Sequence, residues 1–305
     1  DRVTSDFPIA SDEWQRWTNQ TNRYNSTSLT QVMSEYFKDY SIGDCGGEPG
    51  AYVPKPGYPG TLAPGDTFVE NVGLDAKRDD TCTDSSLEYY CNSGGLILRS
   101  NATFTAKNSS FANSWQQKGG VVYGEANTTV FLESSIFHDN YAKIEGGVLS
   151  LESGSRVTLR SCNFSNNRLA NSGTAKGTVI YGANNVSIVA QNSHFENHGY
   201  PTPEGNYCTY ETDCDYDSGY TGGVLFCGEF CDARFERCKF HRNRAFFAAV
   251  AYLKKMSEIS FNLCVFTQNY ARNDGGVILM EANGHVIFQN CNASNNTAQY
   301  DNGYG

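Results

Sequence analysis

The amino-acid sequence predicts an all-β protein, a right-handed parallel β-helix of about seven to eight rungs with an N-terminal helical cap. Three observations predict this fold. A Gly-Gly-apolar-apolar element recurs along the chain, a block of alternating apolar residues recurs between its copies, and both keep a period close to 27 residues. A period of this length is typical of proteins built from stacked structural units.

The Gly-Gly element marks the start of each unit. Clear copies occupy residues 94–97, 119–122, 146–149, 222–225 and 275–278, and weaker copies occupy 176–179 and 248–251. Taking the second residue of each copy, the successive intervals are 25, 27, 30, 46, 26 and 27 residues. Only one interval is long, which indicates a single insertion.

Between these elements lies an eight-residue block whose first, third, sixth and eighth positions are small or apolar. Its copies are residues 130–137, 157–164, 188–195, 233–240, 259–266 and 286–293. The sixth and eighth positions share a face with the first and third only after a slip of one residue, so we expect a bend or bulge inside the block. The block ends on a phenylalanine column, Phe137, Phe164, Phe240 and Phe266, followed three residues later by Asn140, Asn167, Asn243, Asn269 and Asn296, with His198 as the exception.

A unit of about 27 residues cannot bury its apolar face alone, so it must stack on its neighbours. Stacking like on like places each Phe over a Phe and each Asn over an Asn, at the strand spacing of about 4.8 Å. This arrangement is a parallel β-helix. A leucine-rich repeat would need Leu at fixed spacing and a helical segment in each unit, and a propeller blade would need about 40 residues, so neither fits.

The combination of Phe-x-x-Asn with Gly-Gly-apolar-apolar resembles the repeats of chlamydial polymorphic outer membrane proteins and related pectin-lyase-like surface proteins. The Phe-x-x-Asn copies are residues 137–140, 164–167, 240–243 and 266–269, and the resemblance covers residues 94–305. It implies a right-handed helix and an adhesive role at a surface. Outer-membrane anchoring is not part of what it implies for this chain.

The region before the repeats divides into two parts. Residues 1–42 contain an amphipathic helix, predicted over 26–40, which we expect to cover the first rung as a cap. Residues 43–93 are rich in Gly and Pro and include Cys82 and Cys91, which predicts an extended, disulfide-containing connector. The parallel β-helix then spans residues 94–305, with an insertion at about 198–220.

Charge and hydropathy exclude two classes of partner. The 305 residues carry a formal net charge of -10 without a Lys/Arg run, so we expect no binding to nucleic acid. No stretch approaches the ~20 apolar residues that cross a bilayer, so we expect no membrane insertion. The first nine residues lack the pattern of a signal peptide, which predicts that the sequence is mature material.

Cysteines and sequons predict a secreted, extracellular or cell-surface glycoprotein. Eleven cysteines are more than a reducing cytosol usually holds, and the close pairs Cys82/Cys91, Cys208/Cys214 and Cys227/Cys231 are disulfide candidates. Asn-x-Ser/Thr sequons predict N-linked glycans at Asn19, Asn25, Asn101, Asn108, Asn127, Asn163, Asn185, Asn292 and Asn295. The alternative is a bacterial surface protein in which these sequons occur by chance.

Four further cysteines share one column of the repeat, two residues before the phenylalanine column: Cys162, Cys238, Cys264 and Cys291. We expect them to point inward as a stack of buried thiols. A disulfide between Cys238 and Cys264 is the alternative, because adjacent rungs lie just inside the separation that a disulfide tolerates. A metal site is not expected, since no histidine shares the column.

The insertion at about 198–220 is rich in tyrosine and carboxylates. An exposed loop of this composition on a rigid solenoid is a candidate site for a glycan or protein ligand, with a merely decorative loop as the alternative. Alternating carboxylates at Asp213, Asp215 and Asp217 are similar to a calcium-binding loop, although Gly falls one place late and no Glu closes the loop. Calcium is thus the one candidate cofactor.

The expected function is structural or adhesive. Residues 301–304 match the start of another rung, so either more protein follows or the open end stacks on another molecule in an end-to-end filament. Predicted partners are therefore copies of the same chain or further domains, together with N-linked glycans and a surface ligand.

Two other classes stay open, although we do not expect an enzyme. A polysaccharide lyase or hydrolase of the pectin-lyase-like class would need two convergent carboxylates and a basic residue in a groove. The histidines His138, His194, His198, His241 and His285 fall on different rungs and suggest no such cluster. A carbohydrate- or protein-binding module would be favoured by an aromatic patch along one face.

Overall fold

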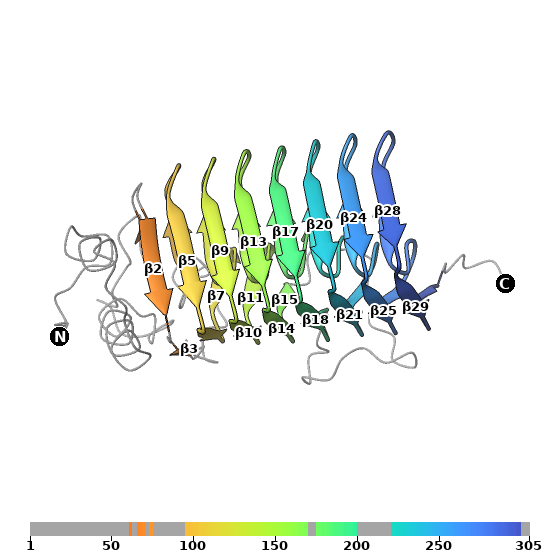
Figure 1. The fold of residues 1–305 in the computed structure, drawn as a ribbon, viewed down its shortest axis with the longest axis horizontal. Coiled ribbons are helices and arrows are strands. Elements are labelled where there is room, and N and C mark those ends of the chain that lie inside the picture. Colours follow the sequence, from red (N-terminus) through yellow and green to blue (C-terminus); the bar gives the residue numbers. More distant parts are fainter. Residues whose placement is uncertain are drawn as a thin grey trace, which may run out of the picture.

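The computed structural model describes residues 61–62, 66–70, 73–75, 95–169, 175–199 and 221–299. In these ranges the chain forms a parallel β-solenoid of about seven turns, built from strands and turns without a helix (Figure 1). The predicted all-β parallel solenoid is confirmed. The predicted cap (1–42) and residues 200–220 of the predicted insertion lie outside the described residues.

Three long sheets run along the solenoid, and each turn contributes one strand to each of them (Figure 1). Sheet A contains β1 (Thr61–Leu62), β4 (Leu96–Leu98), β8 (Val122–Gly124), β12 (Leu149–Leu151), β16 (Ile180–Gly182), β19 (Leu225–Cys227), β23 (Ala251–Leu253) and β27 (Ile278–Met280). Sheet B contains β2 (Asp66–Glu70), β5 (Thr103–Lys107), β9 (Thr129–Glu133), β13 (Arg156–Arg160), β17 (Ser187–Gln191), β20 (Asp232–Glu236), β24 (Glu258–Asn262) and β28 (His285–Gln289). Sheet C contains β3 (Gly73–Asp75), β6 (Ser110–Ala112), β10 (Ile136–His138), β14 (Asn163–Ser165), β18 (His194–Glu196), β21 (Lys239–His241), β25 (Val265–Thr267) and β29 (Asn292–Ser294).

Two three-stranded sheets lie between sheet C and the next strand of sheet A. The first contains β7 (Trp115–Lys118), β11 (Tyr141–Glu145) and β15 (Arg168–Leu169). The second contains β22 (Arg244–Ala245), β26 (Tyr270–Ala271) and β30 (Thr297–Ala298). The long interval of the sequence repeat falls between β18 and β19, where the first of these small sheets has ended and the second has not begun.

The sheets extend into the range predicted as a connector. Strands β1, β2 and β3 pair in parallel with β4, β5 and β6, so residues 61–75 contribute a strand to every long sheet. Sequence reasoning placed the start of the solenoid at residue 94 because these strands lack the Gly-Gly and Phe-x-x-Asn motifs. The Gly/Pro-rich composition of residues 43–66 masked the alternation in β2.

Left-handed backbone conformation recurs at three corners of each turn. The corner between sheets A and B has positive φ at Asn101, Asn127, Gly154, Asn185, Phe230, Met256 and Asn283. Asn and Gly adopt this conformation at low cost, which explains why they predominate at this corner. The corner between sheets B and C falls at Ser134 (φ 50°) in the turn of β9 and β10, so the bend predicted inside the eight-residue block is confirmed.

A fourth left-handed position, just before sheet A, explains the Gly-Gly element. Gly146 has φ 63°, and a Cβ there would lie 2.0 Å from the carbonyl oxygen of Leu149. The bridge from Glu145 to Lys176 aligns Gly177 (φ 64°) with Gly146, the first glycine of its pair. The register predicted for residues 176–179, which matched Gly177 to the second glycine, is therefore wrong by one residue.

Inward-facing phenylalanines of sheet C form a continuous stack through the core. The ring centroids of Phe137 and Phe164 lie 4.9 Å apart, with planes 12° from parallel. The same stacking joins Phe111 to Phe137, Phe164 to Phe195, Phe195 to Phe240 and Phe240 to Phe266, at 4.9 to 5.2 Å. The predicted column is confirmed, and each stacked pair contributes about 0.5–1.5 kcal/mol beyond the burial of its area.

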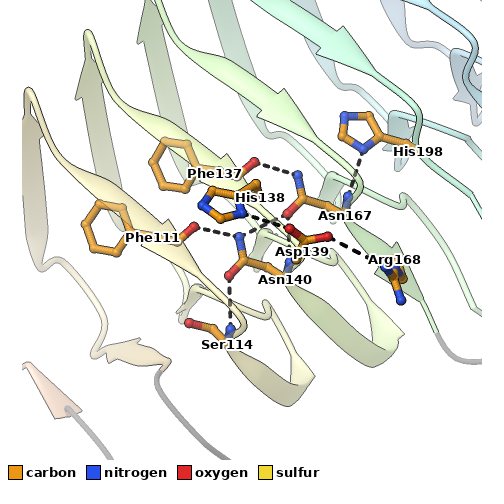
Figure 2. Close-up of polar contacts among 9 residues, drawn as sticks. All are labelled: Phe111, Ser114, Phe137, His138, Asp139, Asn140, Asn167, Arg168 and His198. Carbon is orange, nitrogen blue, oxygen red and sulfur yellow. Dashed lines mark hydrogen bonds and ion pairs between the residues drawn. The ribbon is translucent and has the colours of Figure 1, made fainter. Parts of the chain in front are cut away.

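The asparagine column forms a buried hydrogen-bond ladder next to this stack (Figure 2). The Nδ2 group of Asn140 donates to Asn167 Oδ1 in the next turn and to the carbonyl oxygen of Phe111 in the previous turn, both at 3.0 Å. In the following turn, the backbone N–H of Asn167 donates to Nδ1 of His198 at 3.1 Å. His198 thus replaces one asparagine of the ladder, as the sequence predicts.

The predicted inward cysteine column also has the expected burial. Cys162, Cys238 and Cys264 are buried free thiols, and Cys291 in the last described turn is partly buried and free. The Sγ of Cys264 donates to the carbonyl oxygen of Phe235 at 3.4 Å, a weak hydrogen bond to the previous turn. The alternative of a Cys238–Cys264 disulfide is therefore not the state of this structure.

One of the three predicted disulfides lies in the described residues. Cys227 and Cys231 are bonded, with Cα atoms 5.7 Å apart, and they close the corner between β19 and β20. The candidates Cys82, Cys91, Cys208 and Cys214 lie outside the described residues.

Candidate ligand-binding face

The outer face of sheet A carries a column of large side chains. In each three-residue strand the first and third side chains point into the core, so the central side chain points outward. Along the solenoid the outward residues are Ile97, Tyr123, Ser150, Tyr181, Phe226, Tyr252 and Leu279, each paired with the next. Aromatic rings therefore line the middle of this face.

Three of these rings stack on one another. The centroids of Tyr181 and Phe226 lie 5.4 Å apart with planes 11° from parallel, and those of Phe226 and Tyr252 lie 5.4 Å apart at 4°. Phe226 between the two tyrosines is only 4% exposed although it faces away from the core. The column is interrupted at Ser150, which separates Tyr123 from Tyr181 by two strand spacings.

Charged side chains flank the column at the turn of Ser150. Glu145 ends β11 just before this strand and Glu152 follows it, so the two carboxylates stand on opposite sides of Ser150. The Nζ atom of Lys118 lies 2.5 Å from Glu145 Oε1 and 3.4 Å from Glu152 Oε1, and so reaches across the strand between them. The hydroxyl of Tyr123 donates to Glu152 Oε1 at 3.2 Å.

These contacts shift the pKa values of the neighbouring groups. Burial alone would lower the pKa of Lys118, but its hydrogen bond to Glu145 and the charges of Glu145 and Glu152 raise it above its usual value. Burial, together with the same two carboxylates, raises the pKa of Tyr181 to about 12. At neutral pH the lysine is therefore a cation and the tyrosine is uncharged.

Charged side chains also flank the column at Tyr252, toward its C-terminal end. The hydroxyl of Tyr252 donates to Glu281 Oε1 at 2.9 Å, and Lys254 Nζ lies 2.6 Å from the same oxygen. Burial and the bond to Glu281 raise the pKa of Tyr252 to about 12. Sheet A therefore presents uncharged tyrosines bordered by ion pairs.

Histidines predicted to be scattered lie on one outer face of sheet C. Because the rungs stack, His138, His194 and His241 occupy strands β10, β18 and β21 of the same sheet. His138 Nδ1 lies 2.8 Å from Asp139 Oδ2, and Asp139 Oδ1 lies 3.6 Å from Arg168 (Figure 2). The three residues lie on different turns, as the sequence indicates, and share one face of the sheet because the turns stack.

This polar cluster is a surface network rather than an enclosed centre. Exposed ion pairs such as His138 with Asp139 contribute about 0–1 kcal/mol each. Among the residues that the structure describes, no group of three or more His, Cys, Asp or Glu side chains could hold a metal ion. The calcium candidates Asp213, Asp215 and Asp217 lie outside those residues, so calcium at that loop stays a prediction.

The predicted glycosylation sites fall mainly on corners. Asn101, Asn127 and Asn185 occupy equivalent exposed positions at the corner between sheets A and B. Exposed sites elsewhere are Asn108, Asn292 and Asn295, while Asn19 and Asn25 lie outside the described residues. Asn163 differs because it lies on β14, partly buried, with an Oδ1 atom that is buried and has no partner among the described residues.

Comparison of the chain with protein-family models, curated proteins and solved structures found no match. The resemblance to chlamydial and pectin-lyase-like repeats therefore rests on the short motifs alone. Within the described ranges, no helix has the length and apolar character needed to cross a membrane. Functional argument for this chain thus depends on its own surfaces.

Sequence reasoning missed the sheet-A face. The outward column has no residue type that recurs in successive turns, because packing in the core constrains only the inward positions. The available signal was the residue that directly follows each Gly-Gly element once the register is corrected: Tyr123, Ser150, Tyr181, Phe226 and Tyr252.

Proposed function

We propose that the chain is an extracellular structural or adhesive glycoprotein, in which a stiff solenoid presents the outer face of sheet A to a surface ligand. The stacked rings of Tyr181, Phe226 and Tyr252 are the observation that carries this proposal. They lie outside the core, so the fold does not require them, and aromatic side chains bordered by paired charges are typical of binding surfaces.

The proposed compartment and modification rest on separate observations. The Cys227–Cys231 disulfide and the eleven cysteines favour an oxidising environment. Three sequon asparagines on one corner would place glycans along one edge of the solenoid, beside the aromatic column rather than over it. The right-handed sense of the coil and the helical cap over its first turn belong to the same proposal.

End-to-end assembly is the structural part of the proposal. In the last described turn, Met280 and Phe288 are 39% and 51% exposed, although each continues an inward column that earlier turns cover, and the outward Ile287 is 41% exposed. Strand β28 has a partner on one side only within the described residues. Another rung, from this chain or from a second copy, would bury this apolar end and pair its strands.

A surface-adhesion assay tests the adhesive role. Beads coated with the purified chain should bind to host or matrix surfaces, and the double variant Phe226→Ser/Tyr252→Ser should lose most of this adhesion while keeping the circular dichroism of a β-solenoid. The matched control is Thr105→Ser on the outer face of sheet B. Equal adhesion of the double variant and the control would contradict the role of sheet A.

A polysaccharide hydrolase is the second candidate, because Glu145 and Glu152 converge on Lys118. Their Oε1 atoms can be no more than about 6 Å apart, a limit compatible with the ~5–5.5 Å between paired carboxylates in retaining glycosidases. The raised pKa of Lys118 keeps it protonated, which suits a counter-ion and argues against a lyase base. Release of reducing ends from a polysaccharide panel, abolished by Glu145→Gln and by Glu152→Gln, would favour this candidate over the adhesive one.

A further inference from the structure

The aromatic column of sheet A has one gap, and its dimensions are set by the strand spacing. Tyr123 and Tyr181 are both outward neighbours of Ser150, on β8 and β16. Two strand spacings separate their rings by about 9.6 Å. A ring placed midway would lie about 5 Å from each tyrosine, close to the 5.4 Å at which Phe226 stacks on Tyr181.

The floor of this gap is polar and unsatisfied. Ser150 has no exposed surface, and its Oγ has no hydrogen-bond partner among the described residues. An unpaired buried hydroxyl has lost the hydrogen bonds that water would give it, so a ligand that supplies a partner recovers them. The hydroxyl stands on the outer side of β12, in the same column as the tyrosine rings, and so faces the space between them.

Lys118 covers the gap from above. Its ammonium spans from Glu145 to Glu152 over Ser150 and lies 5.7 Å from the ring centroid of Tyr123. Its side chain is 38% exposed, so it can swing outward without unfolding a strand. The cover is thus a flexible side chain that is held by two ion pairs.

We infer that the gap at Ser150 is a binding slot for one neutral pyranose ring of a glycan, sandwiched between Tyr123 and Tyr181. This inference rests on the proposed adhesive function and names its ligand class. The two tyrosine faces supply apolar contact to the ring, and Ser150, Glu145 and Lys118 supply acceptors and donors for its hydroxyl groups.

The charges of the slot select a neutral ligand. A uronic acid would bring its carboxylate against Glu145 and Glu152, and an amino sugar would compete with Lys118 for the same two carboxylates. A neutral sugar meets neither cost, because Lys118 already balances part of the negative charge. Its hydroxyl groups can join the existing ion pairs as additional partners.

At a neighbouring position of the column, a side chain of the protein fills the space between two tyrosines. Phe226 occupies the equivalent place between Tyr181 and Tyr252 and closes that space with its own ring. The flanking positions there are Thr221 and Gly228, so the carboxylates of the Ser150 turn have no counterparts. The same column therefore offers an internal comparison between a position covered by the side chain of Lys118 and one filled by an aromatic ring of the column itself.

The experiment is a calorimetric titration of the full chain with cellohexaose, mannohexaose, a chitosan hexamer and an oligogalacturonate. A neutral hexasaccharide should bind best, and Ser150→Tyr should weaken that binding by at least about tenfold, because its ring completes the stack. Tyr123→Leu, which removes one wall and leaves the floor, should also weaken it about tenfold. Thermal unfolding identifies any variant that fails to fold.

Three outcomes would overturn the inference: no binding by the neutral hexasaccharides, tighter binding of the charged oligomers, or unchanged binding by Ser150→Tyr. Thr105→Ser, on the outer face of sheet B, serves as the control and should leave binding at Ser150 within about twofold. If Ser150→Tyr still supports bead adhesion while oligosaccharides fail to bind, the slot is refuted and the adhesive function stands. If adhesion also fails in the parent chain, the proposed function itself is refuted.

Discussion

Asn140 and Asn167 lie in successive turns, and the side-chain oxygen of Asn167 accepts hydrogen bonds from both the backbone N–H and the Nδ2 group of Asn140, each at 3.0 Å. The Nδ2 group of Asn167 in turn donates to the carbonyl oxygen of Phe137 at 2.9 Å. Both asparagines have no exposed surface. One side chain therefore satisfies three buried polar groups of the preceding turn.

Replacing Asn167 by leucine should destabilise the protein by about 3 kcal/mol, because the buried N–H of Asn140 and the carbonyl of Phe137 lose these bonds and Asn140 Nδ2 keeps only its bond to Phe111. Urea unfolding followed by circular dichroism measures the change. Ser165→Ala, two residues away on the outer face of β14, should cost less than about 0.5 kcal/mol. Similar losses for the two variants would show that the ladder is not a major source of stability.

His198 should make stability depend on pH. Burial lowers the pKa of His198 to about 3, so the folded protein holds it neutral while an unfolded chain protonates it near its ordinary pKa of 6.5. Its stabilising effect is complete above pH 6.5 and is lost as pH falls toward 3, by about 1.4 kcal/mol per pH unit. At pH 5 the loss is about 2 kcal/mol relative to pH 7.

The variant His198→Asn should remove this dependence and restore the asparagine of the other turns. Its Oδ1 can accept from the backbone N–H of Asn167 in place of the imidazole Nδ1. Unfolding free energies at pH 7 and pH 5 should differ less in the variant than in the parent chain. An unchanged difference would assign the pH dependence to other groups.

Phe230 should be replaceable with a gain in stability. It is 53% exposed and has φ 57° at a corner where other turns carry Asn or Gly. Left-handed backbone costs a non-glycine residue about 1–2 kcal/mol, and asparagine tolerates it better. Phe230→Asn should therefore stabilise the protein by about 1 kcal/mol in thermal or urea unfolding. A destabilised variant would mean that the exposed ring has contacts that outweigh the backbone strain.

The sequon asparagines at the corner between sheets A and B should carry N-linked glycans more often than the partly buried Asn163. Expressed in a glycosylating host, the chain should carry N-linked glycans at Asn101, Asn127 and Asn185, and little or none at Asn163, where Oδ1 is buried. Enzymatic deglycosylation in heavy-oxygen water followed by peptide mass mapping measures the occupancy of each site. Equal occupancy at Asn163 and Asn127 would contradict the expectation.

The predictable part of the fold is the part that repeats in the core. Phe137 and Asn140 could be assigned to interior columns because stacking in register forces the same residue type to recur at each turn. The first copy of this pattern, Phe111 followed by Ser114, escaped notice because serine replaces the asparagine. Strands β1 to β3 escaped for the same reason, since their turn lacks every motif of the repeat.

The candidate site was not predictable in the same way. Ser150 and its tyrosine neighbours lie on the outer face of sheet A, where core packing does not make residue types recur, so their alignment becomes visible only when the turns are stacked. The convergence of Glu145 and Glu152 on Lys118 likewise joins residues from two turns.

The bonds that link neighbouring turns all run parallel to the long axis of the solenoid. The hydrogen bond from Thr128 N–H to Ser155 Oγ, for example, joins residues 27 positions apart and connects one turn only to the next. Tension applied at one end of the rod would therefore detach the terminal turn before loading the others. A detached turn of about 27 residues would release about 90 Å of extended chain, so a tethered molecule would yield in regular steps, with a longer one for the turn that carries the insertion.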